Sequence, residues 1–228
     1  MLHLPGPPPV SVILRRSARS RRLSLRVSRL DGKVTLSMPP HVREAEAMAF
    51  LHAQENWLRR ALAKSAGSMT VAMGTEIPVE GRLVRLVPGR GRTPRLEGDM
   101  LILPGDPARA GVRAAAFLKA RARDRLAMAS DQHAAAIGKS YHRLTLRDTR
   151  SRWGSCTAEG GLMYSWRLVM APPDVLDYVA AHEVAHLVQM NHSPAFWAVV
   201  RDLMPGYEAP RLWLKREGHS LHGYRFNT

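Results

Sequence analysis

The amino-acid sequence predicts an α+β fold in which a small antiparallel β unit with one helix precedes a larger, more helical domain. Short runs in which apolar and polar residues alternate, as they do in β-strands, are concentrated in the first half of the chain. Longer patterns with helical spacing dominate the second half. Of the 228 residues, 45% are hydrophobic, which is enough to form a buried core. The charged fraction of 23% is near the average for globular proteins.

The first ten residues contain the run Pro5-Gly6-Pro7-Pro8-Pro9. This run cannot continue a helix or a central strand, so residues 1–10 are expected to form an extended leader. A β-rich region with one helix is expected over residues 11–105. It opens with strand-like runs at Ser11–Arg15 and Leu23–Arg29, and Asp31-Gly32 predicts a tight hairpin turn into the next strand.

The rest of this region contains one helical pattern and three further strands. The helix is expected over Val42–Ala63, where apolar side chains recur on one side. Strands are expected at Glu76–Val79, Leu83–Val87 and Met100–Leu103, each flanked by glycine. These strands complete the expected antiparallel β unit.

The second domain is expected over residues 106–228. It begins with a long helix, because Asp106 can cap the start and Gly138 can end it. Strands are expected at 144–146 and 162–169, on either side of a loop. Pro172-Pro173 then predicts the start of another helix.

That helix contains His182-Glu183-Val184-Ala185-His186. Residues four apart on a helix are offset by only about 40° and about 6 Å, so the two imidazoles can share a metal ion. Glu183 lies one residue further round, from where it can activate a metal-bound water without being a ligand. Two neutral imidazoles leave most of the zinc charge uncompensated, which makes that water acidic. The segment therefore predicts one zinc ion (Zn²⁺) per chain, with Glu183 as the catalytic base.

A catalytic zinc ion usually has three protein ligands, and His192 is the strongest candidate for the third. On a continuous helix it would lie about 120° and about 9 Å from His186, so the helix must end between the two. Asn191 tolerates the left-handed conformation that ends helices, and Ser193-Pro194 suits the start of the next one. The alternative third ligand is a glutamate further along the chain, Glu208 or Glu217.

Several motifs accompany these histidines in a fixed order between about residues 105 and 214. They are Arg152-Trp153-Gly154-Ser155-Cys156, Trp166-Arg167-Leu168, Tyr178-Val179, the His-Glu-x-x-His segment and Asn191-His192-Ser193-Pro194. This set resembles the YgjP-like metallopeptidase family, to which SprT-like and Wss1-like proteases are related. The resemblance implies a compact zincin-type α+β fold and zinc-dependent hydrolysis, and it leaves the substrate open.

Candidate substrate-binding residues lie on both sides of the metal motif. Arg152 and Trp153, in a glycine-containing loop, can bind a carboxylate, a phosphate or a peptide backbone. Ser155 or Cys156 can donate a hydrogen bond into the cleft. A structural turn that packs Trp153 against the metal-binding helix explains the same residues. Tyr207 can stabilise an oxyanion, and a packing role explains it too.

Three functions are compatible with these residues. The first is a zinc metallopeptidase acting on a peptide or protein, and the open position beside Glu183 favours it over a structural zinc site. The second is a zinc-dependent nucleotide phosphohydrolase (a pyrophosphatase), in which Arg152 and Arg167 line a basic cleft. The third is a basic nucleic-acid-binding module with a structural zinc ion.

The net charge of +15 arises in both halves of the chain. Residues 1–110 contain 18 Lys/Arg against 9 Asp/Glu, and residues 111–228 contain 16 against 10. Such a charge suits a nucleic acid, and a solvated arginine-rich surface explains it equally well. No stretch of apolar residues is long enough for a membrane span. The absence of a secretory signal and the single cysteine, Cys156, predict a cytoplasmic protein.

Overall fold

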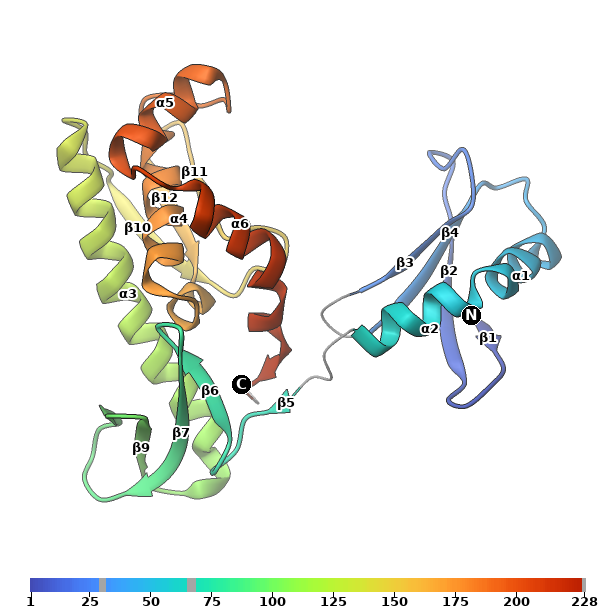
Figure 1. Ribbon diagram of the computed structural model, residues 1–228, viewed down its shortest axis with the longest axis horizontal. Helices are drawn as coiled ribbons and strands as arrows, with labels where there is room; N and C mark the ends of the chain where they lie inside the picture. The colour runs from blue at the N-terminus through green and yellow to red at the C-terminus, as the bar shows by residue number, and fades with distance from the viewer. Residues whose placement is uncertain (29–31, 65–68, 227–228) are drawn as a thin grey trace. The chain divides into compact units, whose positions relative to one another are not determined.

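The computed structural model describes residues 1–28, 32–64 and 69–226, and it divides the chain into two compact units, Met1–Met69 and Thr70–Thr228. Both are drawn in Figure 1. The boundary expected near residue 105 falls inside the second unit. The reason is that the second group of strands shares its hydrophobic core with the long helix that follows it.

The first unit is a four-stranded sheet with two helices on one face (Figure 1). Its strands are β1 (Leu2–Leu4), β2 (Val10–Arg16), β3 (Ser24–Val27) and β4 (Val34–Met38), in the order β1-β2-β4-β3. The central strands β2 and β4 run parallel, and the outer pairs are antiparallel. The sheet is therefore mixed, where an antiparallel unit was expected.

Two helices, α1 (Glu44–Ala53) and α2 (Glu55–Lys64), replace the single helix expected over Val42–Ala63. The chain leaves helical geometry at Gln54, where φ is −98° and ψ is 7°. Both helices pack on the inward side chains of the sheet, which alternate with outward ones along each strand. The buried residues of this core are Leu4, Val10, Val12, Val34, Leu36, Met38, Ala47, Leu51 and Leu58.

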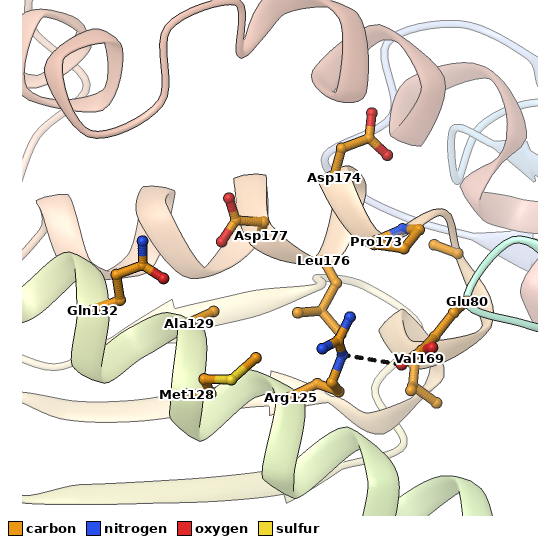
Figure 2. A pocket seen from close by; sticks show the side chains of 11 residues that line it. Glu80, Arg125, Met128, Ala129, Gln132, Val169, Pro173, Asp174, Leu176 and Asp177 are labelled. Atoms are coloured by element: carbon orange, nitrogen blue, oxygen red, sulfur yellow. Dashed lines mark ion pairs between the residues drawn. The ribbon is translucent and has the colours of Figure 1, made fainter.

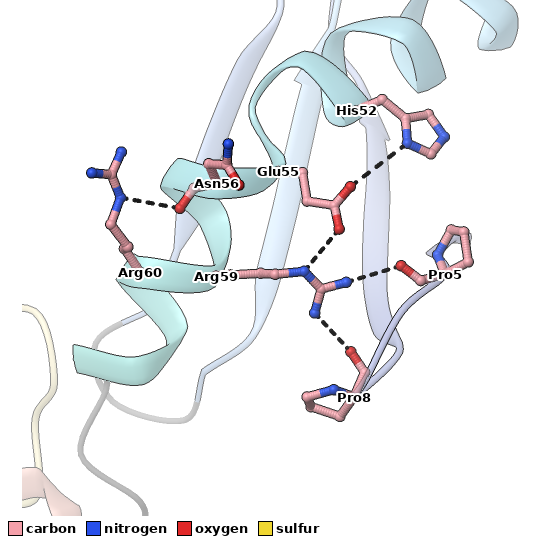
Figure 3. Close-up of polar contacts among 7 residues, drawn as sticks. All are labelled: Pro5, Pro8, His52, Glu55, Asn56, Arg59 and Arg60. Atoms are coloured by element: carbon pink, nitrogen blue, oxygen red, sulfur yellow. Dashed lines mark hydrogen bonds and ion pairs between the residues drawn. The ribbon is translucent and has the colours of Figure 1, made fainter.

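Residues 1–10, expected as an extended leader, belong to the sheet and to the turn between β1 and β2. Arg59 on α2 holds this turn by donating to the carbonyls of Pro5 at 2.9 Å and Pro8 at 3.0 Å, and its Nε donates to Glu55 at 2.8 Å (Figure 3). The prolines thus lie outside the ladder, where a missing N–H costs nothing. Of the predicted hairpin turn, Asp31 lies outside the described residues.

The second unit opens with another four-stranded sheet, which repeats the strand order and directions of the first. Its strands are β6 (Glu76–Val79), β7 (Arg82–Gly89), β8 (Arg95–Glu97) and β9 (Met100–Pro104), in the order β6-β7-β9-β8. Again the central pair, β7 and β9, is parallel and the outer pairs are antiparallel. One face packs against α3 (Ala110–Ala136), which follows a short 3-10 turn capped by Asp106, whose carboxylate accepts from the Ala108 N–H at 2.9 Å.

A third sheet and three helices complete the second unit. The sheet contains β10 (Arg143–Arg147), β11 (Gly154–Cys156) and β12 (Gly161–Ser165), in the order β10-β12-β11. The strand expected over 162–169 ends at Ser165, and Trp166–Met170 forms a 3-10 helix. The helices are α4 (Pro173–Ala185), α5 (Pro194–Leu203) and α6 (Glu208–Glu217).

The last described strand lies beside the start of the second unit. The Val71 N–H, just after β5 (Met69–Thr70), donates to the carbonyl of Arg225 in β13 (Tyr224–Arg225) at 2.7 Å. Within the described residues, none of the helices combines the length and the apolar composition that crossing a membrane requires.

Candidate metal centre

Three imidazoles converge at the C-terminal end of α4. His182 lies in the last helical turn, His186 follows the helix directly, and His192 lies in the loop before α5. The ring centroids are 4.9 to 5.1 Å apart, and one nitrogen from each ring lies within 4.8 Å of the others. His182 is half-buried, His186 is buried and His192 is exposed, so the group opens to solvent on the His192 side.

The end of α4 lets His192 fold back towards the other two rings. The helix ends at Ala185, and α5 begins at Pro194 with the Ser193 hydroxyl accepting from the Phe196 N–H at 3.4 Å. The left-handed residue expected at Asn191 is absent, since among the described residues the only non-glycine with positive φ is Glu80. Instead the Asn191 side chain accepts from the Ser193 N–H at 3.1 Å and forms the turn itself.

These donors fit a zinc-like cation. Nε2 of His182 and Nε2 of His192 are 3.0 Å apart, close to the ~3.3 Å that separates two ligands in a tetrahedral site with bonds of about 2.0–2.1 Å. Nδ1 of His186 donates to the Gln189 carbonyl at 2.9 Å, which leaves its Nε2 lone pair free for a metal. Nδ1 of His182 is buried without a hydrogen-bond partner among the described residues.

The two helix-end histidines are held in the neutral form that binds metals. Burial lowers the pKa of His182 to about 3, and His186, His192 and the Arg211 guanidinium act in the same direction. Burial also lowers the pKa of His186, against the effect of its hydrogen bond to Gln189. No proton therefore has to leave either ring before a cation binds at neutral pH.

Aromatic side chains pack against the three imidazole rings. The fully buried Phe196 lies 4.5 to 4.9 Å from all three imidazole centroids. Trp197 packs beside Phe196, and the centroid of its ring is 5.9 Å from that of His192. Tyr207 is stacked on Trp197 and is almost fully buried, so the structure places this residue in the packing around the centre. Phe196 and Trp197 follow Pro194 at the start of an amphipathic helix. The amphipathic pattern in the sequence indicates that one side of this helix is buried.

Glu183 is buried beside this centre, with only 6% of its surface exposed. Burial raises the pKa of its carboxyl to about 8, and the Arg152 guanidinium opposes this shift. A bound dication would also favour the ionised form. The side chain lies against β11, where a Cβ on Gly154 would stand 2.5 Å from Oε1 of Glu183. Gly154 was not singled out from the sequence, because a glycine in a loop motif gives no signal of its tertiary neighbour.

The residues expected to bind substrate differ in their exposure to solvent. Arg152 is exposed, while Trp153 and Ser155 are half-buried in and next to β11, and the Trp153 ring lies 5.0 Å from His222. Arg167 is buried and fully engaged. It donates to Asp148 at 2.7 and 3.1 Å and to two carbonyls, those of Leu221 and Tyr224, at 2.8 and 3.1 Å.

Strand β11 forms one edge of its sheet. The Trp153 carbonyl accepts from the Ser165 N–H at 2.8 Å, and the Thr157 N–H donates to Gly161 at 3.0 Å. In an antiparallel ladder such pairs alternate with residues whose backbone groups point the other way. The N–H and C=O groups of Gly154 and Cys156 therefore point to the edge of β11 that no described strand covers.

Cavities lie at both ends of α4 in the second unit. One of about 230 Å³ is lined by His186 together with Leu187, Val188 and Met190, and so it adjoins the metal centre. A second cavity, of about 300 Å³, lies at the opposite end of α4, against α3 (Figure 2). None of the three histidines lines it, and its charged residues include the ion pair between Arg125 and Glu80, at 3.0 Å.

Comparisons with known proteins bear on the family of this chain. A protein-family model described as the YgjP-like metallopeptidase domain matches residues 21–217. No curated protein matches the chain. The crystal structure of the metallopeptidase zymogen of Pyrococcus abyssi abylysin is similar to part of it. The two sequences are 21% identical, the match covers 42% of this chain and 95% of that one, and the TM-score is 0.34.

The family model spans well over half of the chain and includes the three histidines and Glu183. The chain therefore belongs to the YgjP-like metallopeptidase domain family and is a metallohydrolase.

Proposed function

We propose that this chain is a zinc-dependent peptidase with a zincin-type catalytic domain built on α4. His182, His186 and His192 are the ligands of one zinc ion, and Glu183 is the general base. The observation that carries the proposal is the convergence of three imidazole nitrogens within 4.8 Å, next to a buried carboxylate. Three nitrogen ligands leave one coordination position open, as in catalytic sites and unlike closed structural ones.

A peptide substrate is favoured by the edge strand beside Glu183. Extended peptides add to exposed sheet edges through main-chain hydrogen bonds, while pockets select alternate side chains. The outward backbone groups of Gly154 and Cys156 supply such an edge. The cavity beside His186 supplies a pocket with a mixed lining, in which Val188 and Met190 are apolar and Lys139 and Glu159 are charged.

When bound, zinc supplies a Lewis acid that polarises the scissile carbonyl and acidifies a water. The protein's own groups do the rest. Glu183 takes a proton from the attacking water as the new C–O bond forms, and gives it to the leaving amine nitrogen as the C–N bond breaks. The edge of β11 holds the peptide extended, and Phe196 keeps the ligand rings in place. Arg152 lies near Glu183 and remains the candidate for contacting substrate.

The phosphohydrolase alternative rests on Arg152 and Arg167 together. The hydrogen bonds of Arg167 to Asp148 and to two carbonyls occupy its guanidinium, so only Arg152 is free to meet a phosphate. This weakens the alternative without removing it. A purely structural zinc site accounts neither for the open coordination position nor for the buried carboxylate of Glu183 beside it.

The proposal is tested with the purified chain loaded with zinc. Unfolded protein, short peptides and nucleoside triphosphates are offered to the wild type and to Glu183→Gln. We expect metal-dependent peptide cleavage, a loss of about 10²–10⁴-fold in the variant and unchanged zinc content. Hydrolysis of triphosphates with intact peptides would establish the phosphohydrolase instead. Equal cleavage by wild type and variant would remove Glu183 from its role.

A further inference from the structure

The sheet of the first unit has an outer face that neither α1 nor α2 covers. Residues that alternate with the buried core point to this face, and all of them except Ile13 are polar or charged. In one row across the sheet, Arg15 on β2 pairs in register with Ser37 on β4, which pairs with Ser24 on β3. In the next row, Thr35 lies between Ile13 and Arg26.

Five exposed arginines gather on this face and at the end of the sheet where β2 and β4 finish. Arg15 and Arg26 lie on the strands, and the others lie in the loop between β2 and β3. The Ser17 N–H fixes that loop to the Met38 carbonyl, at 3.0 Å, at the end of β4. We call Arg15, Arg19, Arg21, Arg22 and Arg26 the arginine face.

The positive charge of the arginine face is not neutralised within the described part of the chain. None of its five guanidinium groups makes a hydrogen bond or ion pair with another described residue. By contrast, Arg16 turns towards the helix side and donates to the carbonyls of Pro40 and Val42. Over residues 1–30 the sequence contains seven arginines and no Asp or Glu.

The carboxylates that the structure describes in this unit belong to the helices. Glu46 pairs with Arg43, and Glu55 pairs with Arg59, both within one helix or at its start. Glu44 lies 3.9 Å from Arg16. The acidic groups therefore gather on the helix side of the sheet and leave the outer face positive.

The second sheet shows that this charge is not a consequence of the strand arrangement. It has the same order and directions, and it also presents arginines outward. There, however, Arg85 pairs with Glu76 at 2.8 Å and Arg95 with Glu97 at 2.5 Å. The same topology thus occurs with a neutralised face in one unit and an unpaired cationic face in the other.

We propose that the arginine face binds the phosphate backbone of nucleic acid. Arginine and the hydroxyls of Ser and Thr are among the side chains that contact phosphates in protein–DNA complexes, and this face combines both. It presents no Phe, Tyr or Trp on which a base could stack, so the contact does not read sequence. This binding is independent of the metal centre and goes beyond peptide hydrolysis.

The dependence of binding on salt measures the number of phosphates contacted. The full chain is titrated into a labelled DNA duplex of about 20 base pairs, between about 50 and about 200 mM KCl. Five contacts predict a slope of log Kobs against log[KCl] of about −4 to −5. Two duplexes of unrelated sequence are expected to bind equally. A slope near zero, or no binding at the lowest salt, would overturn the proposal.

Replacing Arg15, Arg22 and Arg26 together by Ser locates the contact. We expect weaker binding at every salt concentration and a slope shallower by about 3, because three counterion-releasing contacts are removed. The three side chains are exposed, so the melting temperature should stay that of the wild type. The single changes Arg15→Ser and Arg26→Ser, each expected to reduce the slope by about 1, provide the same test if the triple variant folds poorly.

The matched control removes the same charge elsewhere. Arg60 on α2 and Arg90 and Arg92 in the loop after β7 are exposed, and their replacement by Ser should leave the slope unchanged. Equal weakening by both triple variants would show that net charge alone is responsible, and the proposal would fail. It would fail as well if the chain bound vesicles containing phosphatidylserine through the same arginines and did not bind the duplex.

Discussion

Gly154 and Glu183 are in such close contact that no side chain fits between them. A Cβ on Gly154 would stand 2.5 Å from Oε1, 2.6 Å from Cγ and 2.7 Å from Cδ of Glu183. Edge strand β11 thereby fixes the position of the carboxylate relative to the three histidines. The glycine is needed for the space that it leaves, since its φ lies in the range open to other residues.

Gly154→Ala should therefore displace Glu183 and slow hydrolysis while the metal stays bound. Misplacing a reacting group by about 1 Å costs on the order of 10²-fold in rate. We expect a fall of that size in kcat, with unchanged metal content. Gly223→Ala is the matched control, because a Cβ there would meet nothing within 4 Å and the glycine has no positive φ. Wild-type kcat in Gly154→Ala would show that Glu183 is not positioned by this contact.

His192→Ala should weaken metal binding by more than about 100-fold, since loss of a ligand costs more than loss of its hydrogen-bond partner. Metal content after dialysis measures this directly. The control is His142→Ala. His142 is an exposed histidine whose Nδ1 donates to the Glu159 carbonyl at 2.7 Å, and it is not among the three. Full metal retention in His192→Ala would show that another residue, such as Glu208 or Glu217, is the third metal ligand.

Glu80 should stabilise the second unit in a pH-dependent way. Hydrogen bonds from Arg121, at 3.1 and 2.8 Å, lower its pKa below the ordinary 4.5 despite partial burial, and Arg125 adds to this. A lowered pKa means that the carboxylate contributes stability above pH 4.5 and loses that contribution as the pH falls through the folded-state value.

Glu80→Gln should lower the free energy of unfolding by about 1–2 kcal/mol at neutral pH, a modest loss because solvent screens these partly exposed ion pairs. Below pH 4.5 the loss should become progressively smaller. Urea unfolding followed by tryptophan fluorescence measures it, since Trp57 is the only tryptophan outside the second unit. Glu76→Gln, which breaks one exposed pair with Arg85, should cost less than about 1 kcal/mol. A difference at Glu80 that does not change with pH would contradict the prediction.

Arg152 and Arg167, paired in the sequence-based hypothesis, should behave differently. Arg167→Met leaves Asp148 and two carbonyls without their partner and should lower the free energy of unfolding by about 3 kcal/mol. Arg152→Met, at an exposed site, should change stability by less than about 0.5 kcal/mol. Its effect should appear in kcat/KM instead. Similar destabilisation by both changes would place Arg152 in the structural network as well.

Local patterns in the sequence predicted elements better than their pairing. The strand Glu76–Val79 has the expected bounds, and Asp106 acts as a cap, as its position before Pro107 indicates. The turn that it caps is the 3-10 helix Pro107–Arg109, which leads into the long helix. Alternation of apolar and polar residues shows which face is buried and says nothing about the neighbouring strand. For this reason an antiparallel β unit was expected, whereas the two sheets contain the parallel pairs β2–β4 and β7–β9.

The convergence of the three histidines was predictable to the extent that helix geometry determines it. The spacing of His182 and His186 puts both rings on one side of α4, and the break before His192 follows from the distance that it must cover. Contacts between distant segments carry no local signal. Neither the burial of Arg167 nor the contact between Gly154 and Glu183 could be inferred without the fold.

The stacking of Trp197 on the histidine group has an optical consequence. Its ring lies 5.8 Å from His182 and 5.9 Å from His192, so an indole emitter stands beside the proposed ligands. A paramagnetic ion such as Co²⁺ or Cu²⁺ at that position should quench its emission strongly, while diamagnetic zinc should not. Replacing Trp197 with Phe should abolish most of the quenching. The protein thus contains its own spectroscopic probe of metal occupancy, which reports binding without any substrate.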